Sequence, residues 1–329
     1  MSQPVLSIRQ LCVSFSGQAG ARVGAVEDLS LDLAPGELTA LVGESGSGKS
    51  VSALSVLGLL PMPPARIDAG SIRYTDANGA DHELVGASAK RMRAVRGGEI
   101  AMIFQEPMTS LNPVLSIGSQ IVEAVRLHRR VSVKAARAIA VEAMDRVGIP
   151  DPSQRLRQFP HEFSGGMRQR VMIAIALACQ PRVLIADEPT TALDVTIQKT
   201  ILDLIRGLVE REGLSVLLIT HDLALVSEYA DRIAVMYRSR LLESGAARAV
   251  LRTPAHPYTK GLLETVPELG AGRHRLATLD SYMENASGQT IRIGGTDAVP
   301  WTPGGPESDR TPHTMALVGP EHAVRVVAT

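Results

Sequence analysis

The stretch Gly43–Ser50, with the sequence GESGSGKS, lies between the apolar run Leu38–Val42 and the apolar periodic run Val51–Leu60. This order predicts a strand, a phosphate-binding loop and a helix. The three glycines allow the backbone to turn tightly and to point its N–H groups inward, and the helix that follows places its positive end at the same point. The stretch therefore predicts an anion-binding nest at the head of a helix.

Two side chains of this loop suit a nucleotide and its metal. Lys49 supplies a mobile positive charge for the β- and γ-phosphates, and the Ser50 hydroxyl is placed to ligate Mg²⁺. A glycine-rich turn that only caps a buried helix is the alternative, which the lysine and the flanking runs disfavour. We expect nucleotide contacts from the whole loop: Gly43, Glu44, Ser45, Gly46, Ser47, Gly48, Lys49 and Ser50.

Composition bounds the rest of the chain. With 329 residues, 45% of them hydrophobic, it can bury one large core or two modest ones. Its formal net charge is zero, so the overall balance does not ask for nucleic acid as a partner. Cys12 and Cys179 lie in apolar surroundings, which suits small core residues in a reducing compartment. The N-terminus lacks a signal pattern and no apolar run reaches the ~18–20 residues of a membrane helix, so we expect any membrane-spanning part to be another chain.

The segments on either side of the loop predict a mixed α/β fold. Alternating residues from Leu6 to Leu33, with turn chemistry at GQAGARVG, predict an antiparallel hairpin. Two wholly apolar runs suit buried strands of a parallel sheet, and two less uniform runs also read as strands. The expected strands are Ser71–Thr75, Glu99–Phe104, Arg182–Ala186 and Leu214–Thr220.

Helical periodicity from Ser116 to Val147 predicts an inserted helical lobe, and Ser164 is a plausible N-cap for the helix that follows it. Beyond Pro267 the chain becomes richer in Gly and Pro. Strands are expected at Thr290–Ile293 and around Gly319–His322, as a small β unit docked on the rest. This unit would be held by packing of Trp301, of the Tyr282–Met283 pair and of the apolar alternation Met315–Val327 on either side of GPEH.

Four polar residues follow apolar strands. Asp187 and Glu188 are adjacent carboxylates whose side chains diverge, so two roles are available: holding Mg²⁺ and polarising the water that attacks the γ-phosphate. Gln105 can reach the same metal through its amide oxygen, and His221 can hydrogen-bond the γ-phosphate. Taken singly, Gln105 reads equally well as a surface amide, and His221 as a capping or core histidine.

The order of these pieces resembles the ATP-binding cassette ATPases. GESGSGKS is similar to the Walker A loop, Gln105 to the Q-loop, FSGGM to the family signature, VLIADE to the Walker B strand, TALD at Thr191–Asp194 to the D-loop, and His221 to the switch histidine. The resemblance covers residues 5 to about 245. It implies Glu188 as the catalytic base with His221 and Gln105 in the catalytic set, and Ser50, Gln105 and Asp187 at the metal.

The resemblance also implies a head-to-tail dimer with two ATP molecules between the subunits. Ser164, Gly165 and Gly166 would then cap the γ-phosphate held by the partner's loop, as the N-terminus of a helix is suited to do. A mere helix start is the plainer interpretation of these three residues. Phe15 is similar to the family's adenine-stacking aromatic, although a strand aromatic can equally be core.

A narrower resemblance rests on QEPMTSLNP at Gln105–Pro113 and HPYTKGLL at His256–Leu263, which are similar to segments of oligopeptide, dipeptide and nickel importers. That group implies a second related ATPase or another copy of the chain, two membrane permease chains and, indirectly, an extracytoplasmic binding protein. It implies a peripheral position on the cytoplasmic face of the inner membrane. Many members carry tail cysteines for an iron–sulfur centre, but no cysteine follows Cys179 here, so we expect no such cluster.

The predicted architecture is therefore an α/β P-loop NTPase core with an antiparallel β subdomain, an inserted helical subdomain and a small β-rich extension. The expected ATPase domain spans residues 1–255, with its helical subdomain at about 106–165, and the extension spans 256–329. The predicted function is ATP hydrolysis with Mg²⁺ that drives uptake of peptides or a related small solute, or of nickel or another chelated metal. A soluble non-transport cassette ATPase is the alternative.

Overall fold

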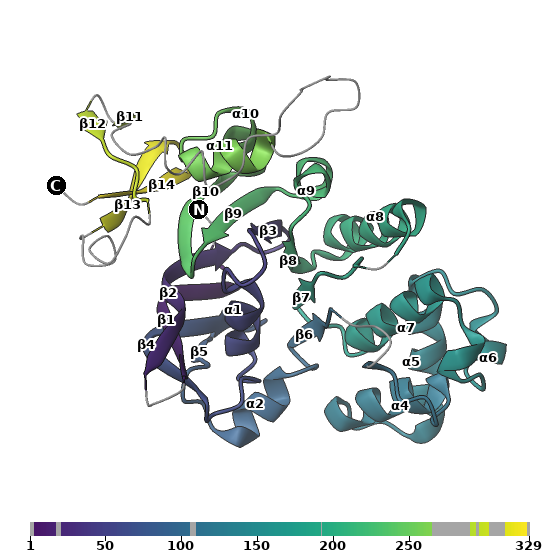
Figure 1. The fold of residues 1–329 in the computed structure, drawn as a ribbon. Coiled ribbons are helices and arrows are strands. Elements are labelled where there is room, and N and C mark those ends of the chain that lie inside the picture. Colours follow the sequence, from purple (N-terminus) through teal and green to yellow (C-terminus); the bar gives the residue numbers. More distant parts are fainter. Residues whose placement is uncertain are drawn as a thin grey trace.

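The computed structural model describes residues 3–17, 21–105, 110–191, 193–264, 290–293, 296–302 and 313–327. Two sheets form most of the fold (Figure 1). The smaller is antiparallel, in the order β2-β1-β4-β5, and the larger has the order β13-β14-β10-β9-β3-β8-β7-β6. A short pair, β11 (Ile291–Ile293) and β12 (Thr296–Ala298), stands apart from both.

The antiparallel sheet contains β1 (Leu6–Ser16), β2 (Arg22–Leu33), β4 (Ala65–Thr75) and β5 (Asp81–Glu83). The predicted hairpin of β1 and β2 is confirmed, with Leu6 opposite Leu33. The strand expected to begin at Ser71 begins earlier, at Ala65, because β4 pairs along the full length of β1 up to Phe15. This sheet packs its apolar face toward α1 and the central sheet in one buried cluster.

The central sheet is built around β3 (Leu38–Val42), which pairs in parallel with β8 and β9. β7 pairs in parallel with β8 and β6, so the predicted parallel sheet is confirmed. Its other strands are β6 (Ile100–Ile103), β7 (Val183–Asp187), β8 (Ser215–Thr220), β9 (Arg232–Tyr237), β10 (Arg240–Ala246), β13 (His313–Gly319) and β14 (His322–Val327). Parallel pairing brings the carboxyl ends of the core strands to one edge.

Helices cover this sheet and form a separate lobe, the latter seen at one side of Figure 1. Those of the core are α1 (Lys49–Val56), α2 (Ala89–Val95), α8 (Val195–Glu212), α9 (Leu223–Tyr229), α10 (Ala247–Arg252) and α11 (Pro257–Glu264). The predicted lobe is confirmed as α4 (Ile117–His128), α5 (Val133–Arg146), α6 (Pro152–Arg155) and the single turn η2 (Pro160–Glu162), packed on α7 (Gly165–Leu177).

The helix after the loop is shorter than predicted. The apolar run continues to Leu60, but α1 ends at Val56, because Gly58 adopts φ +57° and its N–H returns to the carbonyl of Ser55. A glycine in the left-handed conformation is a common helix terminator. None of the described helices is both long and apolar enough to cross a bilayer.

The apolar alternation at the end of the chain forms strands β13 and β14 as predicted, but these strands join the central sheet and do not form a separate unit. Residues Gly319–His322 were expected as a strand but form the turn between β13 and β14, since Glu321 takes φ +55°. β14 then pairs with β10, with Glu243 opposite Val324, so the hairpin extends the central sheet (Figure 1). Trp301 is buried as expected, whereas Tyr282 and Met283 lie outside the described residues.

A buried carboxylate holds this extension in place. Glu243 is fully buried on β10 and accepts hydrogen bonds from the backbone N–H groups of Ala255 (2.7 Å) and His256 (3.0 Å). Its Oε1 also lies 2.7 Å from Nε2 of His322 on β14. Three groups from two segments therefore converge on one side chain, as a buried charge requires.

Glu243→Gln should destabilise the protein by about 2–3 kcal/mol, because an amide donor would then face backbone N–H donors in a buried site. Glu321→Gln is the matched control: its ion pair with Arg232 is half exposed and should be worth less than about 1 kcal/mol. Denaturant unfolding followed by circular dichroism measures both. Equal losses in the two variants would show that Glu243 does not anchor the extension.

Candidate functional site

The phosphate loop is pressed between two strands. Gly43 has φ +150°, and a Cβ there would lie 2.1 Å from the carbonyl oxygen of Met236 on β9. Gly48 has φ +102°, and a Cβ there would lie 2.3 Å from the carbonyl oxygen of Ala25 on β2. Neither position can hold a side chain, so the loop keeps its close approach to both strands.

Lys49 lies inside the loop. Its side chain is buried, and Nζ donates to the carbonyl oxygens of Gly43 and Glu44, both at 2.8 Å. Burial lowers the pKa of Lys49, while the carboxylates of Glu188 and Asp187 act in the opposite direction. The ammonium group is thus held at the mouth of the nest by neutral carbonyl oxygens, which a phosphate oxygen can replace.

Ser50 and Asp187 face each other from different elements. Ser50, at the start of α1, donates from Oγ to Oδ1 of Asp187 at 3.1 Å. Asp187 ends β7 and is 5% exposed. Burial raises its pKa, partly offset by the Ser50 hydrogen bond. A hydroxyl and a carboxylate oxygen at this spacing are the hard donors that Mg²⁺ prefers.

Glu188 collects the remaining polar residues. Gln105 donates from Nε2 to Oε2 of Glu188 at 3.0 Å, and His221 Nδ1 lies 3.4 Å from Oε1. These residues follow β6, β7 and β8, three adjacent strands whose carboxyl ends meet. The predicted clustering is therefore found, although Gln105 presents its amide nitrogen, not its oxygen, to this group.

Thr191 is a contact that the sequence reasoning did not identify. Its Oγ1 donates to Oε2 of Glu188 at 2.8 Å, and Glu188 has φ +46°, which turns the chain back on itself. Burial raises the pKa of Glu188, but the hydrogen bonds from Thr191 and His221 outweigh it and leave the pKa below its ordinary value. The sequence signal that could have indicated this contact is a threonine three residues after a carboxylate at the end of a strand.

These groups border a cavity of about 240 Å³. It combines loop N–H groups, an ammonium, a hydroxyl and a carboxylate, which is the chemistry that binds and cleaves a phosphate chain. Its lining residues are Ala25, Ser45, Gly46, Gly48, Lys49, Ser50, Val51, Gln105 and Glu188.

Nine predicted residues are not among those that line this cavity: Gly43, Glu44, Ser47, Asp187, His221, Phe15, Ser164, Gly165 and Gly166. The first five belong to the loop or contact Ser50 and Glu188 of the lining, whereas the last four do not. Ser164 caps α7 by accepting the N–H of Met167 at 3.4 Å, and it is exposed together with Gly165. Gly166 is buried, and a Cβ there would lie 2.8 Å from Ile197. Phe15 is partly buried against the core cluster of the antiparallel sheet. Neither the signature residues nor Phe15 therefore lines the cavity at this chain's own phosphate loop.

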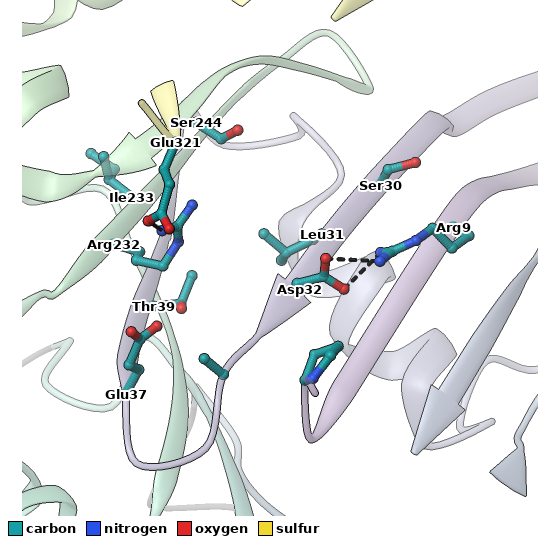
Figure 2. Close-up of a pocket in the computed structure, with 12 residues that line it drawn as sticks. Arg9, Ser30, Leu31, Asp32, Glu37, Thr39, Arg232, Ile233, Ser244 and Glu321 are labelled. Atoms are coloured by element: carbon teal, nitrogen blue, oxygen red, sulfur yellow. Dashed lines mark hydrogen bonds and ion pairs between the residues drawn. The ribbon is translucent and has the colours of Figure 1, made fainter. Parts of the chain in front are cut away.

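A second hollow, of about 540 Å³, lies at the other end of β3 and holds none of the predicted site residues (Figure 2). Its charged groups largely pair with one another: Arg9 with Asp32 at 2.7 Å, and Arg232 with Glu321 at 2.6 Å. The polar cluster at the carboxyl edge is therefore the candidate site.

Strand, loop, helix and converging carboxylates together define a phosphate-loop NTPase. A model of the ABC transporter family matches residues 26–191, and a model of the oligopeptide/dipeptide transporter C-terminal region matches residues 242–290. The chain belongs to the ABC transporter family, as an ATP-binding cassette ATPase.

Relatives agree with this assignment. A putative peptide import ATP-binding protein of Brucella melitensis is 53% identical over 82% of this chain and 79% of its own length. The dipeptide transport ATP-binding protein of Bacillus subtilis is 50% identical over 84% of this chain and 81% of its own length. A solved dimeric bacterial ABC transporter cassette superposes with a TM-score of 0.64 at 23% identity, over 74% of this chain and 99% of that one. This last similarity supports the fold.

The burial of Asp187 leads to a prediction of opposite effects on stability and binding. A carboxyl group whose pKa is raised by folding destabilises the fold above its unfolded pKa of about 3.9, and this cost persists at neutral pH. Asp187→Asn should therefore raise the melting temperature of the nucleotide-free protein and abolish the effect of Mg²⁺ on ATP affinity.

Differential scanning fluorimetry and calorimetric titration with and without EDTA measure the two effects. Asp145→Asn, an exposed carboxylate on α5, is the control and should change neither. A lower melting temperature for Asp187→Asn, or a preserved Mg²⁺ effect, would contradict this account.

Proposed function

We propose that this chain hydrolyses ATP as one half of a cassette dimer and drives import of peptides or a related small solute through separate membrane permease subunits. The observation that carries the proposal is the joint match to the cassette family and to the oligopeptide/dipeptide transporter C-terminal region. Similar proteins are named as import or transport ATP-binding proteins for peptides, dipeptides or glutathione. Nickel or another chelated metal is the second class of cargo in this proposal. Specificity for the cargo would reside in other chains of the transporter.

In this proposal the loop N–H groups and Lys49 hold the β- and γ-phosphates. Lys49 donates to two carbonyl oxygens of the loop, and its ammonium carries three donors, so it can also donate to a phosphate oxygen. Ser50 and Asp187 would hold Mg²⁺, with Gln105 near them after its amide turns, because their oxygens already lie within 3.1 Å of each other. Bound Mg²⁺ would neutralise charge on the phosphates.

Glu188 then serves as the base. Its lowered pKa keeps it ionised at neutral pH, so it accepts a proton as water attacks the γ-phosphorus and the bond to the ADP oxygen breaks. Thr191 and His221 orient the carboxylate through the contacts described above. His221 is exposed enough to exchange Glu188 for the γ-phosphate, which suits a sensor.

The signature completes the site from a second subunit. Ser164 and Gly165 are exposed at the N-terminus of a 13-residue helix, whose N–H groups favour an anion. Because they do not line the chain's own cavity, a head-to-tail partner is the simplest source of the cap. The partner is a related ATPase or a second copy of this chain. Phe15 is proposed to stack on adenine at the open side of the site.

An apolar hollow supports docking to a permease. It measures about 320 Å³ and lies between the helical lobe and the core, lined by Leu59, Phe104 and Leu127 among others. These three side chains are 38%, 43% and 74% exposed, which is costly unless a partner covers them. Phe104 directly precedes Gln105, so a permease helix seated here would be linked to the nucleotide. In this proposal the chain lies peripherally, on the cytoplasmic face of the inner membrane.

We propose that the ATPase domain spans residues 1–255, with the helical subdomain at about 106–165, and that the extension begins at 256. The alternative, a soluble ATPase that does not act in transport, leaves the apolar hollow without a partner. Co-purification with two integral membrane chains tests the choice. Two results together would favour the alternative. The chain would purify without such membrane chains, and Phe104→Ser would keep the ATPase activity of the wild type when assayed in membranes.

Glu188→Gln should bind ATP normally, because the loop and Lys49 are unchanged, but its rate of hydrolysis should fall about 10²-fold or more, because the base is lost. Dimers loaded with nucleotide should accumulate, as size-exclusion chromatography measures. Glu162→Gln, an exposed residue near the signature, serves as a control and should hydrolyse ATP at the parental rate. Parental activity in Glu188→Gln would remove Glu188 as the base.

Gly165→Leu tests the dimer. Among the described residues, a Cβ at this position would meet Leu193 alone, at 3.9 Å, which leaves room for a side chain in the monomer. ATP affinity of the isolated chain should stay unchanged, whereas ATP-dependent dimers and ATPase activity should be lost because the side chain blocks the partner's nucleotide. Weakened ATP binding by the monomer would instead place Gly165 in the chain's own site.

A further inference from the structure

Gln169 connects the helix of the signature to the segment that carries the proposed base. It lies near the start of α7 and is 1% exposed. Its Nε2 donates to the carbonyl oxygen of Pro189 at 2.5 Å, and Pro189 directly follows Glu188 in the chain. Gln169 is not among the residues that line the nucleotide cavity. Its side chain therefore touches the neighbour of the base but not the site itself.

The Gln169 amide gains one contact and lacks another. If the amide were reversed, its oxygen would face the carbonyl oxygen of Pro189, and two acceptors would meet in a buried place. With the nitrogen toward Pro189, Oε1 has no hydrogen-bond partner in the part of the chain that the structure describes. A buried acceptor without a donor is unfavourable by about as much as one hydrogen bond is favourable. Gln169 therefore adds little net stability to the fold.

The Pro189 carbonyl depends on this contact. Pro189 is buried, and a proline has no N–H that could anchor the residue. Among the described residues, Gln169 is the one donor to its carbonyl oxygen. A buried carbonyl needs a donor, so the peptide after Pro189 is held in its orientation by α7.

That peptide lies in the middle of the turn that aims the base. At one end of the turn, the N–H of Glu188 donates to the carbonyl of Ile219 on β8 at 3.0 Å. At the other end, Thr191 donates from its N–H to the Glu188 carbonyl at 3.2 Å and from Oγ1 to the Glu188 carboxylate at 2.8 Å. Without Gln169, the Pro189 carbonyl would rotate toward another donor, and Thr191 would leave the carboxylate.

We propose that Gln169 is a positioning residue for Glu188. By holding the Pro189 carbonyl it keeps Thr191 on the carboxylate, without contact to nucleotide or metal. The helix that presents the signature to a partner thereby also sets the position of this chain's own base. The inference rests on the proposed function, in which Glu188 accepts the proton of the attacking water.

Gln169→Met keeps the length of the side chain but removes the amide, and it is the test. The variant exchanges one unpaired buried oxygen for another, so the melting temperature should change little. The kcat for ATP should fall about ten-fold, because the base is displaced but not removed. The KM and the ATP affinity of the isolated chain should stay unchanged, since the phosphate loop is untouched. Steady-state ATPase assays, calorimetric titration and differential scanning fluorimetry measure these quantities.

A double variant separates positioning from a general loss of packing. Thr191→Val removes the hydroxyl that contacts the Glu188 carboxylate, so it should also lower kcat. If Gln169 acts through Thr191, the double variant should be at most about two-fold slower than the slower single variant. Losses in kcat that multiply would show two independent effects and would overturn the inference.

Gln180→Met is the matched control. Gln180 is exposed and accepts from Arg129 at 2.8 Å, just before β7 begins, whereas Glu188 follows the end of that strand. Its kcat should equal that of the parental chain. Parental kcat in Gln169→Met would overturn the inference, as would a loss of kcat accompanied by equally weakened ATP binding. A parental chain that does not hydrolyse ATP would instead overturn the proposed function, so the two failures are distinguishable.

Discussion

The close packing of the loop backbone on two strands is the constraint from which the rest of the site follows. Met236 on β9 and Ala25 on β2 leave no room for a Cβ at Gly43 or Gly48. The loop is therefore clamped by one strand from each sheet. Since β9 also pairs with β3, which leads into the loop, the antiparallel sheet, the central sheet and the head of α1 are held in one arrangement.

The polar residues of the site come together beside the loop because the ends of three neighbouring strands meet there. Gln105, Glu188 and His221 come from distant parts of the chain, but β6, β7 and β8 are neighbours and parallel, so their successors meet at one edge. The environment then separates the two adjacent carboxylates: burial raises the pKa of Asp187, whereas hydrogen bonds lower that of Glu188. Because their environments differ, Asp187 is suited to hold a metal ion and Glu188 to accept a proton.

Much of this site was predictable because its signals are local. The spacing of the glycines and the lysine predict the phosphate loop. The apolar strands that end in polar residues predict the cluster. The features that the sequence does not predict depend on contacts with residues far away in the chain. The end of α1 differs from the prediction because Gly58 terminates a run that still looks apolar. The β strands of the extension follow from local alternation, but their place in the central sheet does not, because the pairing of Val324 with Glu243 joins β14 to β10 and no local pattern encodes it.

The seating of β14 also has a consequence for the order of events during synthesis. Arg325, fully buried, donates to the Leu241 carbonyl and to Asp28, a residue 297 positions earlier in the chain. A nascent chain cannot close this contact until Arg325 has left the ribosome, whereas the hairpin of β1 and β2 needs only residues up to Leu33. The Glu243 side of β10 therefore stays uncovered until the segment that forms β14 has been synthesised, long after β10 itself.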